Sequence, residues 1–362
     1  MEDSTLSDHG TWMARCLELA ALGATTVAPN PMVGAVLVSQ GRILAEGWHQ
    51  RPGEGHAEVR CLADLNGAPV PADAVLYVNL EPCSHHGRTP PCADLLIHRE
   101  VRHLVIAHTD PFPEVAGRGV DRLRQAGIAV TTGVLQQQAR WLNRRFLTSV
   151  EEQRPFIVLK WARSRDGLLD RHPREERRVQ RISGPASDVL VHRWRSEEQA
   201  ILVGSNTALQ DNPQLTVRLV QGPSPLRIIL DRHGLVPSRS KVYDQTAPTL
   251  LFTSDRRNDV SVEQHLLSPD DDPIDEVLRV LHSRQIRSLL VEGGAQLLRH
   301  FLERGLWDEA RVITGNVLLG QGTPAPLPIG KPWRTMHSGE DVIDHYVNYA
   351  TGRIDPPTLS NA

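Results

Sequence analysis

The sequence predicts an α/β protein built from two domains. The chain has 362 residues, which is longer than a domain with a single compact core usually is. Short apolar, β-branched runs alternate with segments of helical periodicity in both halves, a pattern typical of layered α/β domains with a largely parallel sheet. A charged stretch, Glu151 to Arg154, separates the two series. We therefore predict domains at 1–150 and 151–362.

The first series opens with a helix and a hairpin. Residues 11–24 carry apolar side chains at helical spacing and end near Gly23. The apolar runs 33–38 and 43–48 flank Gly41 and predict two antiparallel strands. The remaining expected elements are helices at 56–65, 91–99, 120–126 and 135–150 and strands at 74–80 and 103–108.

The second series begins after Pro155 and has the same alternation. We expect strands near 156–161, 200–203, 227–230, 249–253, 288–291 and 311–314, and helices near 185–196, 273–284 and 295–304. The Pro- and Gly-rich stretch 320–332 is typical of a long loop before the last strands.

Composition excludes several classes of protein. The formal net charge is −3 without a domain-wide basic excess, which argues against nucleic acid as a partner. No apolar run reaches 18 residues, so we expect no membrane span, and the polar start lacks the features of a signal peptide. We therefore expect a cytoplasmic protein. Four cysteines are too few for a disulfide framework and favour metal or catalytic use.

Lysine is nearly absent, because Lys160, Lys241 and Lys331 are the only ones in the chain. Genomic base composition explains most of this scarcity. The scarcity also gives a small hint that a remaining lysine occupies a position where the guanidinium of arginine would not fit.

His56, Cys83 and Cys92 form the most informative pattern. One imidazole and two thiolates give a three-ligand zinc site that leaves the fourth tetrahedral position open for water, as in catalytic sites. Glu58 lies two residues after His56, and about 200° of helical rotation separates the two side chains. Glu58 can therefore border the metal without binding it, and we assign it the proton transfers of a zinc deaminase.

The separate parts of this pattern are weak. An isolated His-x-Glu is common, and two cysteines nine residues apart are usually buried small hydrophobes. Their joint occurrence, with Pro82 before Cys83 and strand–helix contexts at both halves, favours zinc. Cys16 and Cys61 lie inside helical patterns and are interpreted as core or surface thiols, and no spacing requires His49, His85 or His86 as ligands.

The first half resembles the deaminase domain of bifunctional riboflavin-biosynthesis deaminase/reductases. The resemblance rests on 29–34 (PNPMVG), 47–49 (GWH), 56–58 (HAE) and 80–92 (LEPCSHHGRTPPC), and the long spacing between the cysteines is that family's form. It implies a cytidine-deaminase-like three-layer α/β/α fold and hydrolytic deamination of 2,5-diamino-6-(5-phosphoribosylamino)pyrimidin-4(3H)-one. It also implies that Asn30 contacts the base. The charge of Arg88 and its position on the loop between the cysteines suggest that it reaches the ribose phosphate, although a solvated loop arginine fits equally well.

The second half contains no G-x-G-x-x-G and no P-loop. Glu292-Gly293-Gly294 joins a buried strand to a helix, which suits a phosphate but equally fits tight strand–helix packing. Together with 160–167 (KWARSRDG), 192–195 (HRWR) and 211–218 (DNPQLTVR), this segment resembles the reductase domain of the same family. The resemblance implies a dihydrofolate-reductase-like fold and NADPH-dependent reduction of the ribosyl to the ribityl chain.

The resemblance also implies roles for individual residues. The cofactor would lie against Ser164, Arg181, Thr207, Asp211, Arg232 and Gly294, and the substrate against Lys160, Arg195, Leu215, Arg218 and Glu292. Arg195 and Arg218 make chemical sense as a phosphate clamp, because guanidinium binds oxyanions bidentately. Lys160 would polarise the sugar oxygen that gains charge during hydride transfer.

Some residues depart from the family pattern and leave alternatives open. Arg181 stands where the family usually has Trp, Arg232 follows Asp231 in place of Ser, and Arg165 replaces an apolar residue. A monofunctional deaminase with a degenerate reductase domain is the first alternative. A nucleic-acid-editing deaminase and a structural zinc protein are weaker ones, since structural zinc sites normally have four ligands. The family also implies a homo-oligomer.

Overall fold

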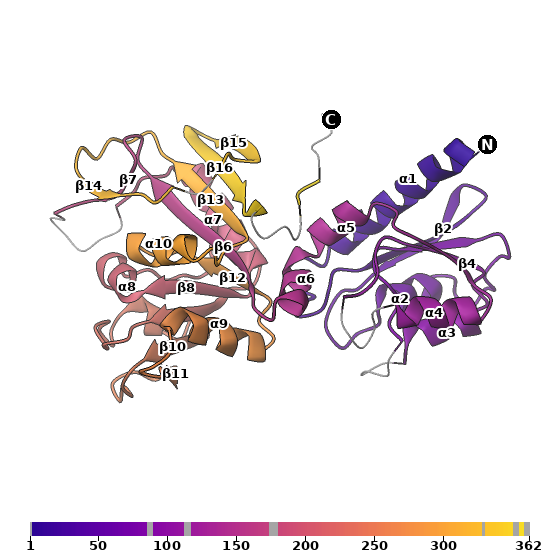
Figure 1. Ribbon diagram of the computed structural model, residues 1–362, viewed down its shortest axis with the longest axis horizontal. Coiled ribbons are helices and arrows are strands. Elements are labelled where there is room, and N and C mark those ends of the chain that lie inside the picture. The colour runs from indigo at the N-terminus through magenta and orange to yellow at the C-terminus, as the bar shows by residue number, and fades with distance from the viewer. Residues whose placement is uncertain are drawn as a thin grey trace. The chain divides into compact units, whose positions relative to one another are not determined.

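The computed structural model describes residues 2–84, 90–111, 117–173, 180–327, 330–349 and 355–357. The chain divides into two compact units, which are Met1–Glu152 with Ile354–Ala362 (unit 1) and Gln153–Arg353 (unit 2). Each unit is built on one main sheet with helices packed against its faces (Figure 1).

Unit 1 carries a five-stranded sheet in the order β2-β1-β3-β4-β5. Strands β3, β4 and β5 are parallel, and β1 pairs antiparallel with β2 and β3. The elements are α1 (Glu2–Ala21), β1 (Gly34–Ser39), β2 (Arg42–Trp48), α2 (Ala57–Ala63), β3 (Val75–Val78), α3 (Cys92–His98), β4 (His103–Ile106), α4 (Arg118–Gln125), β5 (Ala129–Thr132), α5 (Gln136–Leu142) and α6 (Arg144–Glu151).

Alternation along β1 explains the layers of unit 1. Ala35 and Leu37 pack with side chains of α2, α3 and α4, whereas Val36 and Val38 pack with α1 and α5 on the opposite face. The sheet is thus buried on both sides, and the predicted three-layer fold is confirmed. Gly47 on β2 is required for this packing, because a Cβ there would overlap the backbone of Cys61 on α2.

Unit 2 carries a nine-stranded sheet in the order β11-β10-β9-β8-β12-β6-β13-β16-β15. Seven strands from β11 to β13 are parallel, and β16 and β15 close one edge antiparallel. Its strands are β6 (Phe156–Arg163), β7 (Leu168–Arg171), β8 (Ala200–Gly204), β9 (Leu226–Leu230), β10 (Thr249–Thr253), β11 (Glu263–Leu266), β12 (Ser288–Val291), β13 (Glu309–Thr314), β14 (Gly322–Pro324), β15 (Arg334–Ser338) and β16 (Asp341–Val347). Its helices are α7 (Pro185–Glu197), α8 (Ser205–Asp211), η1 (Lys241–Tyr243), α9 (Pro273–Ser283) and α10 (Ala295–Glu303).

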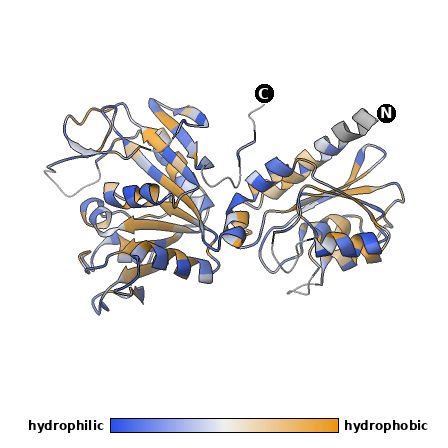
Figure 2. Ribbon diagram, viewed as in Figure 1, coloured by the Kyte–Doolittle hydropathy of each residue, from blue (hydrophilic) through white to orange (hydrophobic). Residues whose placement is uncertain are grey.

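Both faces of this sheet are also covered. Ile157 and Leu159 of β6 pack against α9 and α10, while Phe156 and Val158 face α8 and the loop residue Leu215. The central strands are accordingly almost wholly hydrophobic, and the helices carry both hydrophobic and hydrophilic residues along their length (Figure 2). Strands β7 and β14 form a separate two-stranded sheet.

The sequence-based elements differ from the structure in several places, and strands β5, β7 and β11 were not predicted. The first helix begins at Glu2 and ends at Ala21, earlier than predicted. The single helix expected over 135–150 is divided into α5 and α6 at Asn143, whose side chain bonds the backbone N–H and C=O of Met32 instead. Helix α8 was not predicted, because its seven residues show little apolar periodicity. No helix in the described residues is both long and apolar enough to cross a membrane.

Candidate active sites

The three predicted metal ligands converge in unit 1. His56 precedes the first residue of α2, Cys83 follows β3, and Cys92 opens α3. The Nδ1 atom of His56 lies 3.6 Å from the Cys83 Sγ and 3.3 Å from the Cys92 Sγ, and all three ligand atoms lie within 4.8 Å of one another. Tetrahedral zinc with bonds of about 2.1 and 2.3 Å would hold nitrogen and sulfur about 3.6 Å apart. The donor set and its spacing therefore fit zinc.

Local electrostatics favour the thiolate form at Cys83, whereas the Cys83 sulfur and burial raise the pKa of Cys92. The Cys92 thiol and the His56 imidazole hold the pKa of Cys83 at about 4, against the effect of burial. The Cys83 sulfur also accepts the backbone N–H of Cys92 at 3.3 Å, at the start of α3. An anionic sulfur at a helix start is favoured by the peptide dipoles.

Glu58 lies beside the ligands without joining them. Its side chain is buried in the first turn of α2 and interacts with Cys92. Burial raises the pKa of Glu58, and the neighbouring Cys83 raises it further. A buried carboxyl with a raised pKa takes up a proton more readily than an exposed one, which suits a group that accepts and releases protons in general acid–base work.

His49, to which the sequence analysis assigned no role, contacts both Asn30 and the metal ligand His56. The Nδ2 of Asn30 lies 3.0 Å from the Nε2 of His49, and the His49 Nδ1 lies 3.3 Å from the carbonyl oxygen of Gly55. The His49 ring packs edge-on against His56 at 5.3 Å between centroids. Because a carbonyl only accepts, His49 carries its proton on Nδ1 and accepts from Asn30 on Nε2. The position of His49 in the Gly-Trp-His segment just before His56 was the available signal.

Glu81, next to Pro82 and Cys83, organises the loop after β4. Its carboxylate accepts the backbone N–H groups of Asp110, Gly117, Gly119 and Val120 at 2.9–3.1 Å. Four such bonds fix the start of α4 against the segment that carries Cys83. Arg88, the predicted phosphate contact of this domain, lies outside the described residues.

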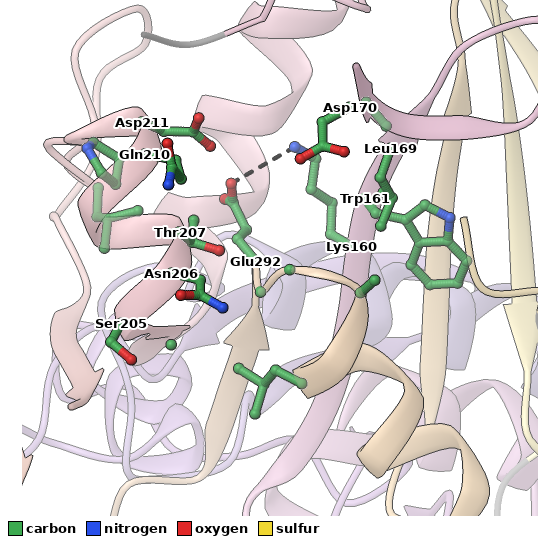
Figure 3. Close-up of a pocket in the computed structure, with 18 of the residues that line it drawn as sticks. Lys160, Trp161, Leu169, Asp170, Ser205, Asn206, Thr207, Gln210, Asp211 and Glu292 are labelled. Atoms are coloured by element: carbon green, nitrogen blue, oxygen red, sulfur yellow. Dashed lines mark ion pairs between the residues drawn. The ribbon is translucent and has the colours of Figure 1, made fainter. Parts of the chain in front are cut away.

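Unit 2 contains a large cavity of 1110 Å³ at the ends of its parallel strands. It is lined by most of the residues predicted for the reductase: Lys160, Arg181, Arg195, Thr207, Asp211, Leu215, Arg218, Arg232, Glu292 and Gly294. Figure 3 labels Lys160, Thr207, Asp211 and Glu292 among them. Lys241, the second of the three lysines in the chain, lines the cavity too. Ser164 is not among the described lining residues. It is buried, and its hydroxyl lies 2.6 Å from the Asp166 Oδ1 and accepts the Leu168 N–H.

Glu292 is the electrostatic centre of this cavity. Arg195 binds its two carboxylate oxygens at 2.8 and 2.9 Å, and the Nζ of Lys160 lies 3.6 Å from the second oxygen (Figure 3). Burial alone would raise the pKa of Glu292, but the charges of Arg195 and Lys160 outweigh it and hold that pKa at about 2. Arg195 is therefore committed to Glu292 before any ligand arrives.

The other predicted arginines differ in their availability. Arg218 is exposed, and its Nη1 donates to the Oγ1 of Thr216 at 2.7 Å. Arg181 pairs with Asp188 at 2.9 Å, and its side chain is 73% exposed. Arg232 is exposed after β9. Arg218 is thus the member of the predicted clamp whose guanidinium is least engaged by the protein.

Gly294 is the N-cap residue of α10 and makes no side-chain cap, so the first N–H groups of this nine-residue helix open onto the cavity. A Cβ on Gly294 would lie 3.4 Å from the Thr207 hydroxyl, which shows how closely α8 approaches this helix start. Uncapped N–H groups and a small residue at this position suit the phosphates of a nucleotide.

Comparison with known proteins gives matches for both units. Residues 155–338 match the family described as RibD C-terminal domain, and residues 6–108 match the cytidine and deoxycytidylate deaminase zinc-binding region. The chain is 38% identical over 319 residues to the riboflavin biosynthesis protein RibD of Aquifex aeolicus, covering 86% of this chain and 88% of that protein. It is 37% identical over 365 residues to that of Escherichia coli, covering 93% and 98%.

Solved structures agree with these matches. A deaminase/reductase of Thermotoga maritima superposes with a TM-score of 0.86 at 35% identity and covers 94% of this chain and 99% of its own. A RibD structure from Acinetobacter baumannii gives a TM-score of 0.85 at 33% identity with the same coverage.

Proposed function

Because the chain belongs to the RibD family of bifunctional riboflavin-biosynthesis deaminase/reductases, we propose a specific reaction, cofactor and role for each domain. Residues 1–150 would deaminate 2,5-diamino-6-(5-phosphoribosylamino)pyrimidin-4(3H)-one. Residues 151–362 would then reduce the ribosyl chain of that product with NADPH, giving 5-amino-6-(5-phosphoribitylamino)uracil. The observation that carries the proposal is the coexistence of the His56, Cys83 and Cys92 group with the Glu292-centred cavity in one chain.

In the deaminase, His56, Cys83 and Cys92 would hold zinc, which supplies a water whose pKa is lowered to about 7. Glu58 would accept a proton from that water at a carboxylate oxygen and deliver it to the departing amino group. Burial of Glu58 supports this role, because it keeps bulk water from competing for the proton. Asn30, oriented by His49, would hold the pyrimidine ring in front of Glu58.

In the reductase, NADPH would supply the hydride, and this chain supplies orientation and charge. The N–H groups after Gly294 would face the cofactor phosphates, with Thr207 and Asp211 beside them. Arg181, Arg232 and Ser164 remain predictions for the cofactor side. Arg218 would bind the substrate phosphate, and Leu215 would pack against the substrate.

Lys160 would stabilise the sugar oxygen that gains negative charge at C1 reduction. The ion pair with Glu292 at 3.6 Å supports this role, since it places the ammonium in the cavity beside Arg195. The Arg195–Glu292 pair would orient Lys160 and meet the polar face of the substrate. A homo-oligomer and a cytoplasmic location stay predictions drawn from the family and the sequence.

The test is turnover of the diaminopyrimidinone followed by mass spectrometry, with and without NADPH. Without NADPH we expect exchange of one amino group for oxygen and release of ammonia. With NADPH we expect the further gain of two hydrogens. If the reaction stops after deamination even with NADPH present, the monofunctional alternative is favoured. That alternative is considered because Arg181 stands where the family usually has an aromatic residue. Binding of transfer RNA or single-stranded DNA in a filter assay would favour the editing alternative.

A further inference from the structure

The segment Leu215–Arg218 carries two residues of the proposed substrate side, and its backbone is unusual. Leu215 has a φ of +58° although it is not a glycine, and it is buried at 2% exposure. A bulky residue in the left-handed region costs energy and persists only where neighbouring contacts hold it. The segment therefore depends on its contacts for its shape.

Two of these contacts come from one face of α7. The N–H of Arg218 donates to the Nδ1 of His192 at 2.9 Å, and the Nη1 of Arg195 lies 3.4 Å from the carbonyl oxygen of Thr216. His192 and Arg195 are three residues apart, so they lie on the same side of the helix. Local contacts add to these, since the Val217 N–H donates to the Ser224 hydroxyl at 3.0 Å and the Arg218 Nη1 lies 3.4 Å from the Thr216 carbonyl oxygen.

The chemistry of His192 matches an acceptor role. A backbone N–H only donates, so the His192 Nδ1 is unprotonated and the ring proton lies on Nε2. Burial, together with the charges of Arg195 on α7 and Arg218 on the loop, lowers the pKa of His192 to about 4, against the opposing charges of Glu292 after β12 and Asp188 on α7. The imidazole is therefore neutral near pH 7 and keeps its acceptor.

We propose that His192 is a positioning residue of the reductase, whose Nδ1 fixes the backbone of Arg218 so that the guanidinium faces the substrate phosphate. His192 lines the cavity, is only 5% exposed and reaches Arg218 from a helix, which is a stiffer support than the loop itself. The inference rests on the proposed function, because it assumes that Arg218 binds phosphate.

The test compares His192→Ala, His192→Asn and His192→Gln with Arg218→Ala. The amide oxygen of Asn can occupy the place of Nδ1, whereas the longer Gln instead mimics Nε2. We expect His192→Ala to raise KM for the phosphorylated substrate about tenfold with little change in kcat, because the partly buried N–H of Arg218 loses its acceptor. His192→Asn should return KM to within about threefold of the wild type, and His192→Gln should not.

Four further readouts separate positioning from general damage. Dephosphorylated substrate should be reduced equally by the wild type and His192→Ala. Inorganic phosphate, tested as a competitor, should inhibit His192→Ala and Arg218→Ala more weakly than the wild type. The double variant should be no worse than Arg218→Ala, since the two residues act as one unit. NADPH binding should not change in any of them.

The outcomes that overturn the inference are distinct from failure of the proposed function. If Arg218→Ala loses the preference for phosphorylated substrate while His192→Ala keeps it, His192 does not position Arg218, and the proposed function stands. If Gln restores KM and Asn does not, His192 acts through Nε2, and the inference is wrong. If Arg218→Ala keeps the preference, the phosphate assignment itself fails. Should His192→Ala not fold, the Asn and Gln pair decides.

Discussion

The two sites of this chain are built in opposite ways. The metal group of unit 1 gathers three ligand atoms from a stretch of 37 residues, His56 to Cys92, in which His56 and Cys92 lie at helix starts and Cys83 lies in the loop after β3. The cavity of unit 2 collects its lining from separated segments between Lys160 and Thr323. A metal site needs few atoms, so a short sequence defines it. A cavity for two substrates depends on the whole sheet.

The two sites also handle buried charge differently. In unit 1 two buried or partly buried sulfurs meet one imidazole, and a metal cation from outside the protein would hold both sulfurs as thiolates. In unit 2 the charge of Glu292 is balanced within the chain by Arg195 and Lys160. Loss of metal should therefore disable the first site alone.

The largest effect should follow loss of a metal ligand. Cys83→Ser is expected to abolish both zinc binding and ammonia release, because two remaining ligands hold zinc poorly. Cys61→Ser is the matched control, since Cys61 is buried in α2 and its thiol donates to the Ala45 carbonyl, away from the metal group. Metal content and ammonia are measured on both proteins. Full ammonia release by a zinc-free Cys83→Ser protein would show that deamination does not require the metal.

Glu58→Gln should have the next largest effect. We expect zinc to remain bound and deamination to fall by ~10²–10⁴-fold, the range for loss of a general acid–base group. Glu46→Gln, a carboxylate paired with Arg15 on unit 1, should leave activity unchanged. Metal content and the rate of ammonia release decide the point. Loss of zinc in Glu58→Gln would make Glu58 a ligand or a structural residue.

A smaller effect is expected in the reductase. Arg218→Ala should lower kcat/KM for phosphorylated substrate roughly 10–100-fold, because charge-assisted hydrogen bonds contribute about 1.5–3 kcal/mol. Dephosphorylated substrate should show little difference. Arg193→Ala, an exposed arginine on α7, is the control and should match the wild type. Equal losses on both substrates would show that Arg218 does not bind the phosphate.

The smallest effect concerns the pH dependence of stability. Burial lowers the pKa of His192 and of His345 to about 4, so both histidines are neutral in the folded unit 2. Their ordinary pKa is 6.5, so the unfolded chain takes up protons first as the pH falls. Unit 2 should therefore lose stability between about pH 6.5 and 4.

His345→Gln should make that loss shallower, whereas His337→Gln, at an exposed position, should not change it. Urea midpoints measured at several pH values test this expectation. Identical slopes in the wild type and His345→Gln would show that His345 does not contribute.

Much of the fold was predictable from the sequence because the strands are buried on both faces. The runs that form β8, β10 and β12 are continuously apolar, and the structure places strands there. Elements without that signal were missed. Helix α8 is polar and short, and β7 pairs only with β14, more than 150 residues later, so its pairing has no local signature.

The two sites also differ in how well the sequence predicts them. The spacing of His56, Cys83 and Cys92 was sufficient to indicate zinc, and the zinc-binding deaminase family match agrees with it. The Arg195–Glu292 pair joins residues 97 positions apart, and only the sheet order brings α7 beside β12. Sequence reasoning therefore assigned Arg195 to a phosphate, whereas the structure shows that its guanidinium is already bound to Glu292.

The central claim is that one chain holds two active sites of independent construction. Ammonia release and NADPH oxidation, the latter on pre-deaminated substrate, should be measured on the same samples of Cys83→Ser and Glu292→Gln. The account predicts that Cys83→Ser loses only ammonia release and that Glu292→Gln loses only NADPH oxidation. It would be contradicted if either variant lost both activities while its circular dichroism spectrum stayed that of the wild type.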